Sequence, residues 1–468
     1  MNVRTHTLPN GCKILIRPTP DKQILSLVAY VGWGGCDDTA AQAGRTNLMA
    51  RLLTKGAAGR TAVQIAETME SVGGSIDAFC SYDHLGIETQ AVQDDWPVAL
   101  ELLSDCLFRP TFDPLEFEKE RAIVLSEILR DNDQKFPYTY KAFHRLFYRG
   151  HPYALPPEGE IETLKGLDQA ALSVLHAAAI RPERVLLTAV GNLPEEKFLA
   201  EVEKRWPASS DGSMGQGPSY GLSGEPANRR TGEPMMGQGP SYGLSGEPAN
   251  RRTGEPMMGQ GPSYGAGADG PAPAQRSLAQ AEPGAGRGET IELPRNFEQG
   301  FVIVGYPAPL PGTPDAAALR MACGILGEGM SSRLFSRLRD RDHLAYSVGA
   351  SISPRALASH VILYIGTSPA TVDQAHASLL REARGIVEEA PEKEEIQRAR
   401  QYILGKYLVG RQTNGALAHS MSVHEMLGLG WEWGETFPDR IEAVTAGDIR
   451  AAALKYLQNP ATAILRPA

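Results

Sequence analysis

The sequence predicts an α+β fold in two similar halves, and three observations support this. An order of strand, helices and strand occurs twice along the chain, which is typical of domains with mostly antiparallel sheets. The composition, 42% apolar and 22% charged, is that of a globular protein able to bury a core. Residues 209–288, between the halves, are rich in Gly and Pro. We therefore expect two domains, 1–208 and 289–468, each a mostly antiparallel sheet flanked by helices, joined by a long linker.

Hydrophobic periodicity predicts the elements of the first half. In order these are a strand region over 5–17 with a turn at Pro9-Asn10-Gly11, a strand over 24–31, helices over 42–54 and 62–72, a long strand over 75–92 and a helix over 95–107. A further helix follows and has a clear start signal, with Asp113 as N-cap, Pro114 at the first position and Glu116 placed to complete a capping box. It is expected to run to about 130.

The second half repeats the scheme. Strands are expected over 298–306 and 347–366, and helices over 316–327, 332–341, 371–389 and 394–409. The glycines Gly327 and Gly329 could suggest a phosphate-binding loop, but no Lys-Ser/Thr follows them. We therefore expect a tight turn at this point.

The linker contains an internal repeat. The sequence GQGPSYGLSGEPANRRTGEPMM begins at Gly215, is repeated from Gly237, and starts again at Gly259. Each copy has one Tyr, one Leu and two Met as its large apolar residues, too few to offset the entropy lost on ordering. We interpret the stretch as a flexible tether expanded by tandem duplication, and a docking tract for a partner is the alternative.

Charge and cysteine usage exclude several classes of function. The formal net charge is −9 and the chain has no basic stripe, so a nucleic-acid partner is not expected. The sequence also lacks a membrane-spanning apolar run and a signal-peptide core at its start. Its five cysteines have no C-x-x-C spacing, which argues against a disulfide framework or a zinc–thiolate site. A cytoplasmic protein without membrane contact is the simplest expectation.

Several ordered motifs carry a family resemblance. The first half contains Gly44-x-x-Asn47-x-x-Ala50-Arg51, then Glu120-Arg121, Ser126-Glu127-Ile128 and His151-Pro152-Tyr153. The second half contains Leu326-Gly327-x-Gly329-x-Ser331-Ser332-Arg333-Leu334-Phe335 and, later, Ala345-Tyr346-Ser347. Together these motifs resemble the pitrilysin/insulinase/mitochondrial processing peptidase family of zinc peptidases. The resemblance spans both halves and implies two homologous domains.

The resemblance also implies where a metal site would lie. Active members carry H-x-x-E-H on a helix, in which two His bind zinc and the Glu polarises the attacking water. The positions that match this motif are Asn47, Ala50 and Arg51. Glu127 matches a third ligand from a later helix, and Glu120 matches a supporting acidic residue.

The residues at the motif positions are chemically unsuited to zinc catalysis. Asn is a poor zinc ligand, Ala cannot act as a general base, and Arg carries a permanent positive charge. No other histidine pair has H-x-x-E-H or H-E-x-x-H spacing. We therefore expect no metal and no cofactor in this chain, and an ion pair between Arg51 and Glu127 in place of the metal. For Glu127 alone, a solvated helix face is the alternative.

Two residues of the second half match a different functional feature of the family. Where an active site is completed across a domain or subunit boundary, an Arg and a Tyr from the non-zinc domain reach the substrate, and Arg339 and Tyr346 match this pair. Arg can bind a substrate carbonyl or carboxylate, and Tyr can donate a hydrogen bond to a developing oxyanion. The alternative places Arg339 in a charged surface run and Tyr346 in the core.

The resemblance also implies a site for the peptide substrate. In this fold an extended peptide adds as a further strand to the edge of the sheet. The matching strand carries the residues Ser75, Ile76, Asp77, Ala78 and Phe79. A strand inside the sheet is the alternative.

Two hypotheses about function follow. The first is a non-catalytic subunit that forms a heterodimer with a zinc-bearing homologous subunit and contributes Arg339 and Tyr346 to its peptidase site. The second is a binding or structural protein that kept the fold and has no role in proteolysis. A self-sufficient hydrolase of another kind has little support, because no G-x-S-x-G motif occurs.

Overall fold

The computed structural model describes residues 3–208 and 286–467, and the tandem repeat of the linker lies outside the described residues. The first half is built on a sheet with the strand order β1-β2-β8-β3-β7-β6. Its strands are β1 (Arg4–Thr7), β2 (Lys13–Arg17), β3 (Ile24–Val31), β6 (Ser75–Cys80), β7 (Leu85–Val92) and β8 (Val185–Val190). A separate small ribbon pairs β4 (Gly56–Ala57) with β5 (Arg60–Thr61).

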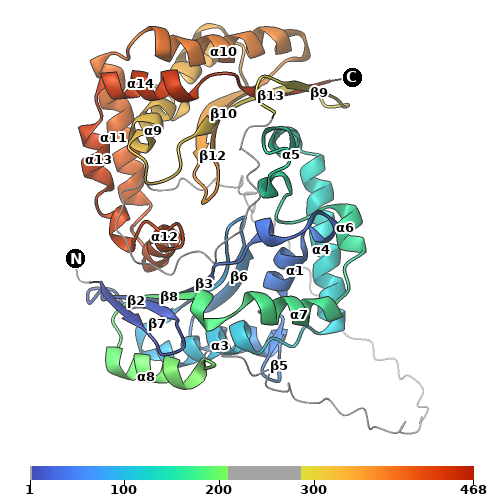
Figure 1. Ribbon diagram of the computed structural model, residues 1–468, viewed down its shortest axis with the longest axis vertical. Helices are drawn as coiled ribbons and strands as arrows, with labels where there is room; N and C mark the ends of the chain where they lie inside the picture. The colour runs from blue at the N-terminus through green and yellow to red at the C-terminus, as the bar shows by residue number, and fades with distance from the viewer. Residues whose placement is uncertain (1–2, 209–285, 468) are drawn as a thin grey trace, which may run out of the picture. The chain divides into compact units, whose positions relative to one another are not determined.

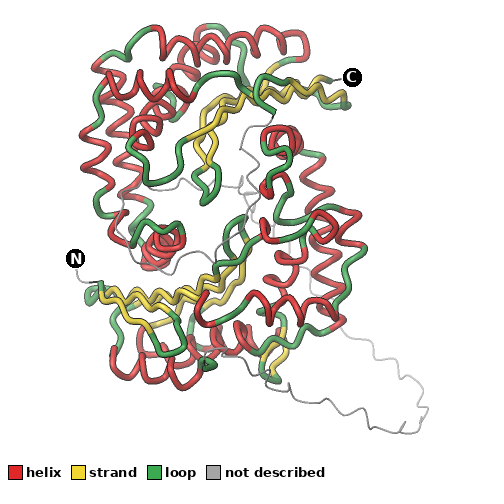
Figure 2. Tube along the Cα trace, viewed as in Figure 1, coloured by secondary structure: helices red, strands yellow, loops and turns green. Residues whose placement is uncertain are grey.

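The second half is built on a sheet with the order β11-β12-β10-β13-β9. Its strands are β9 (Thr290–Pro294), β10 (Gly300–Ala308), β11 (Ser347–Ser353), β12 (Ser359–Thr367) and β13 (Ala461–Arg466). Apart from β1, the two sheets have the same topology, and each has one parallel pair, β2 with β8 and β13 with β9. All other pairings in these sheets are antiparallel. The predicted α+β class, with two similarly built, mostly antiparallel domains, is confirmed (Figure 2).

Helices follow the strands in both halves. In the first half they are α1 (Arg45–Leu52), α2 (Ala62–Ser71), α3 (Trp96–Phe108), α4 (Pro114–Asn132), α5 (Lys135–Phe147), α6 (Ile161–Lys165), α7 (Ala170–Ala179) and α8 (Glu195–Arg205). In the second half they are α9 (Asp315–Gly327), the π-helix η6 (Leu334–Arg341), α10 (Val372–Glu388), α11 (Lys393–Val409), α12 (Asn414–Met426), α13 (Phe437–Ala443) and α14 (Ala446–Tyr456). None of the described helices is long and apolar enough to cross a membrane.

The start signal of α4 was read correctly only in part. The Asp113 carboxylate accepts hydrogen bonds from the backbone N–H groups of Leu115 and Glu116, at 2.8 and 3.2 Å, as an N-cap should. Glu116 does not complete a capping box, because its carboxylate binds the ammonium group of Lys119 at 2.6 Å instead. A nearby cation on the same helix face competes successfully for the exposed carboxylate.

Three predicted strand regions are hairpins. The regions 5–17, 75–92 and 347–366 each form two antiparallel strands, β1 with β2, β6 with β7, and β11 with β12. In the second of these, Ser81 N donates to His84 O at 2.8 Å and closes the turn. Apolar alternation continues through such a turn because both strands keep one face toward the same core, so periodicity alone does not show the break.

Each half lends a helix to the sheet of the other half. Both halves belong to one compact unit. In it α12 packs on β3 and β8, and α5 packs on β10 and β13 (Figure 1). Leu417, Ala418 and Met421 of α12 join a buried apolar cluster with Val28 and Tyr30 of β3. Gly305 on β10 leaves room for α5, since a Cβ there would lie 2.1 Å from the ring of Phe143.

Candidate functional site

The helix that matches the zinc-binding helix of the family is anchored by a buried aspartate. Asp38 is 7% exposed and accepts hydrogen bonds from Gly44 N (3.1 Å), Thr46 N (3.2 Å), Thr46 Oγ1 (2.6 Å) and Arg45 Nε (3.0 Å). Burial raises the pKa of the Asp38 carboxyl, while the hydrogen bonds from Thr46 and Arg45 oppose that rise. The carboxylate thus fixes the first turn of α1. No sequence signal singled out Asp38, which lies six residues before the helix cap.

Gly44 begins this helix in a backbone conformation that suits glycine. Its φ is +95°, and a Cβ there would lie 2.7 Å from the carbonyl oxygen of Glu158. A glycine is therefore needed both for the left-handed turn and for the close approach of the segment that contains Glu158.

Arg51, one of the three matching positions on α1, faces two glutamates of α4. Arg51 Nη2 lies 2.5 Å from Glu127 Oε2, so the predicted ion pair is present. Arg51 Nη1 is also 3.7 Å from Glu120 Oε2. Lys55 Nζ lies 3.1 Å from Glu120 Oε1, so each carboxylate has a cation beside it. Lys55 was missed, and it lies in the turn just after α1, which ends at Leu52.

The residues at this place do not fit a zinc ion. Ala50 is fully buried and supplies no donor atom. Asn47 is 8% exposed, and its Nδ2 has no hydrogen-bond partner among the described residues. The described parts of the chain contain no group of three His, Cys, Asp or Glu side chains able to hold a metal ion. The two cations Arg51 and Lys55 instead neutralise the two carboxylates that remain.

Arg339 lies on the π-helix η6. The hydrogen bond that Asp342 N donates to Arg337 O at 3.0 Å spans five residues, as is typical of a π-turn. Such π-turns occur often at functional sites. The neighbouring arginines of this helix are paired, Arg337 with Glu382 at 2.8 Å and Arg341 with Asp342 at 2.8 Å. Arg339 is exposed and has no ion pair with a described residue. Its guanidinium carbon instead lies 4.8 Å from the ring centre of Phe335.

Tyr346 directly precedes β11, one of the two edge strands of the second sheet. Its backbone N–H donates to Gly366 O at 2.9 Å, which fixes the start of the strand. Its side chain is 60% exposed, so it is not a core residue as the alternative required. No described side chain forms a hydrogen bond with its hydroxyl. Both residues of the pair are therefore accessible and retain their hydrogen-bonding capacity.

The strand expected to receive peptide lies at an edge of its sheet. β6 pairs only with β7, and its outer side has no strand neighbour in the described structure. Asp77 is exposed and lies opposite Glu88 on β7. Burial, and then the charge of Asp77, raises the pKa of Glu88. Phe79 packs edge-on against Tyr30, with ring centres 5.0 Å apart, so the inner part of the strand is anchored to the core.

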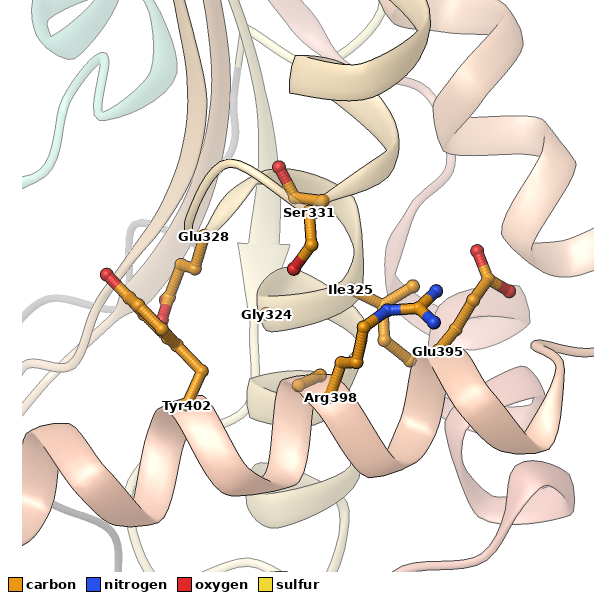
Figure 3. Close-up of a pocket in the computed structure, with 9 residues that line it drawn as sticks. Gly324, Ile325, Glu328, Ser331, Glu395, Arg398 and Tyr402 are labelled. Carbon is orange, nitrogen blue, oxygen red and sulfur yellow. The ribbon is translucent and has the colours of Figure 1, made fainter.

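The glycine-rich segment after α9 forms a small pocket against α11, with room for roughly one water molecule (Figure 3). The two carboxylates in its wall are already neutralised. Glu328 binds Arg320 with two hydrogen bonds of 2.6 and 2.8 Å, and Glu395 binds Arg333 with two of 2.7 and 2.6 Å. Gly329 has a φ of +79°, so the segment makes the expected tight turn.

The fold and the site define a metallopeptidase-like chain with Asn47, Ala50 and Arg51 at the positions that match the zinc-binding motif. Two family models match it, "Insulinase (Peptidase family M16)" over residues 13–159 and "Peptidase M16 inactive domain" over residues 255–403. The chain belongs to the pitrilysin/insulinase family, peptidase family M16.

Curated relatives and solved structures cover nearly the whole chain. An uncharacterized zinc protease of Streptomyces coelicolor is 25% identical over 475 residues, covering 99% of this chain and 90% of that protein. An uncharacterized zinc protease of Bacillus subtilis is 21% identical, and the match covers 91% of this chain and 88% of that protein. The fold is similar to a peptidase M16 inactive domain from Pseudomonas fluorescens, with a TM-score of 0.77, 17% identity, and coverage of 100% and 98%. A chain of complex III2 from Candida albicans is also similar, with a TM-score of 0.74, 13% identity, and coverage of 99% and 96%.

Proposed function

We propose that this chain is the non-catalytic subunit of a heteromeric zinc endopeptidase. It lacks the groups that hold zinc and activate water, because Asn47, Ala50 and Arg51 occupy their positions. A homologous partner with an intact H-x-x-E-H motif supplies the zinc and performs the hydrolysis. This chain contributes Arg339 and Tyr346 to the partner's active site.

One observation carries the proposal: Arg339 and Tyr346 are exposed and unengaged in a region where neighbouring charges are paired. A surface arginine with acidic neighbours normally forms an ion pair, as Arg337 and Arg341 do. Arg339 stacks on Phe335 instead, which fixes the side chain without using its five N–H donors. The free guanidinium can bind a peptide carbonyl or carboxylate, and the Tyr346 hydroxyl can donate to the oxyanion that forms during hydrolysis.

The substrate is an extended peptide. The open edge at β6, with the residues Ser75, Ile76, Asp77, Ala78 and Phe79, supplies backbone groups for an additional strand. Backbone hydrogen bonds of this kind do not depend on the sequence of the peptide. The acidic pair Asp77 and Glu88 at this edge favours basic side chains in a bound segment.

The test is peptide cleavage by the assembled complex. The chain is co-expressed with the H-x-x-E-H homologue, and wild type is compared with Arg339→Ala and Tyr346→Phe at equal complex concentration. Each variant should lower kcat/KM by on the order of a hundredfold, because loss of one oxyanion donor removes about 3 kcal/mol of transition-state stabilisation. Assembly, followed by size-exclusion chromatography, should be unchanged.

Two control variants separate this role from general surface effects. Arg341→Ala removes a neighbouring arginine that already pairs with Asp342. Asn47→Ala changes a residue that takes no part in hydrolysis in the proposed complex. Both should keep wild-type activity. Equal activity in all five proteins would refute the shared site. It would favour the alternative of a binding or structural protein, for which the similar chain in complex III2 is a precedent in fold.

A further inference from the structure

The loop 354–358, between β11 and β12, is held by side chains of the first half. Ala356 N donates to Asp83 Oδ2 at 3.3 Å, and Leu357 N donates to the Tyr153 hydroxyl at 3.0 Å. The guanidinium carbon of Arg355 lies 3.7 Å from the ring centre of Tyr82. Asp83 and Tyr82 belong to the β6–β7 turn, so this junction joins the two halves of the chain directly. We refer to the loop and the groups that hold it as the junction.

His360 on β12 lies at the centre of the junction and is fully buried. The Tyr148 hydroxyl lies 2.8 Å from both Ala358 O and His360 Nδ1. A carbonyl only accepts, so the Tyr148 hydroxyl gives its proton to Ala358 and receives the Nδ1 proton. His360 Nε2 then accepts from the Tyr140 hydroxyl at 3.1 Å. The neutral Nδ1–H tautomer thus satisfies every group in this part of the junction.

His144 on α5 holds the loop only when it is neutral. The side chain is 3% exposed, and its Nε2 lies 3.4 Å from Arg355 Nη2. A guanidinium has donors and no acceptor, so Nε2 must accept this bond and carry no proton. His144 Nδ1 is 3.4 Å from the Tyr82 hydroxyl. Protonation of His144 Nε2 would remove the hydrogen bond from Arg355, and two positively charged N–H groups would then face each other.

Burial and the charge of Arg355 oppose protonation of both histidines, and against them a hydrogen bond with the Tyr153 backbone raises the pKa of His144. The titratable and charged groups around the two histidines are Tyr140 and Tyr148 on α5, Tyr82 and Asp83 in the β6–β7 turn, His151 and Tyr153 in the segment after α5, and Arg355 in the loop. The one carboxylate in this set, Asp83, already receives hydrogen bonds from Tyr153 and Ala356. Burial, followed by the charge of Arg355, holds the pKa of both histidines well below the ordinary value.

We propose that the junction is an acid-sensitive clasp between the two halves, which opens when His144, and with it His360, takes up a proton. The histidines are neutral in the closed clasp and have an ordinary pKa of about 6.5 once exposed to water. The open form therefore binds more protons, and acid favours it. The clasp is fully stable above about pH 6.5 and weakens as the pH falls below that value.

Hydrogen exchange of the full chain tests the clasp. The amides of residues 355–357 donate within the closed junction, so their exchange reports its opening. Between about pH 7.5 and about pH 5.5, the protection of this segment, corrected for the intrinsic rate, should fall about tenfold if one histidine is released and about a hundredfold if both are.

Two variants identify the group responsible. His144→Gln keeps an acceptor for Arg355 but cannot titrate. Between the two pH values, the protection of residues 355–357 in this variant should therefore fall at most a few-fold if His360 stays buried and neutral. His176→Gln is the matched control. His176 also has a pKa lowered by burial, but it binds Leu107 O at 2.8 Å away from the junction, so this variant should keep the full pH response.

Two results would overturn the proposal. The first is that the protection of residues 355–357 in wild type does not change between the two pH values. This measurement uses only the wild-type protein. The second is a fall in His144→Gln as large as that of wild type and of His176→Gln.

Discussion

Replacing Asp38 by alanine should destabilise the first half far more than the loss of an ordinary helix cap. Asp38 accepts four hydrogen bonds, and three of their donors, Gly44 N, Thr46 N and Thr46 Oγ1, are buried. The fourth donor, Arg45 Nε, belongs to a partly exposed guanidinium whose Nη1 still donates to Gln42 Oε1 at 2.7 Å. The substitution therefore leaves three buried donors without an acceptor.

The size of the effect follows from that count. Each orphaned buried donor costs about 1–3 kcal/mol. The gain from each bond in the native protein is partly offset by the cost of burying the carboxylate, which is visible in its raised pKa. Taking the low end for each of the three donors, we expect Asp38→Ala to lower the free energy of unfolding by about 3–4 kcal/mol.

Equilibrium unfolding in urea measures this difference. With an m-value of about 3 kcal/mol/M, the first unfolding transition should move to lower urea by about 1 M. Thr61→Ala is the control. Thr61 is an exposed N-cap of α2 that accepts one bond from Gln64 N at 3.3 Å, and its loss should cost only about 1 kcal/mol. Equal shifts for the two variants would show that Asp38 is no more than a surface cap.

Two further predictions concern metal and the junction. The purified chain should hold less than about 0.1 zinc per molecule by elemental analysis, because Arg51 and Lys55 already balance the two remaining carboxylates, and one tightly held zinc would contradict this. Tyr148→Phe should cost about 2–4 kcal/mol in urea unfolding at neutral pH, since Ala358 O and His360 Nδ1 both lose a buried partner. Tyr402→Phe, in which the lost hydroxyl has no hydrogen-bond partner among the described residues, should be neutral and serves as its control.

Local sequence patterns located the predicted helices well, although α5 to α8 and α12 to α14 were not predicted. The predicted helices lie within three residues of their observed ends, because a buried stripe of apolar residues marks each of them. The strand β8 was not predicted, because all six of its residues are buried and the sequence therefore shows no alternation of apolar and polar residues there. The turn of the first hairpin was predicted from Pro9-Asn10-Gly11, but the turns of the other two hairpins were missed for a related reason, because the strands on both sides share one core.

The residues of the candidate site were predictable from the sequence, but the residue that holds its helix in place was not. The positions of Asn47, Ala50 and Arg51 follow from motif spacing, and the ion pair with Glu127 follows from their charges. Asp38 could not be found in this way. It reaches α1 through a folded connection, and an isolated aspartate before a helix has many other uses.

The sequence by itself determined the fold class, and from residue type and local spacing it predicts the loss of zinc chemistry and the roles of Arg339 and Tyr346. Only the tertiary structure decided that Tyr346 is exposed, that β6 is an edge strand, and that α5 and α12 cover the sheets of the opposite halves. The junction of His144, His360 and Arg355 also required it. The junction brings together residues more than 200 positions apart, and such contacts are chosen by the packing of whole sheets and helices rather than by any local pattern.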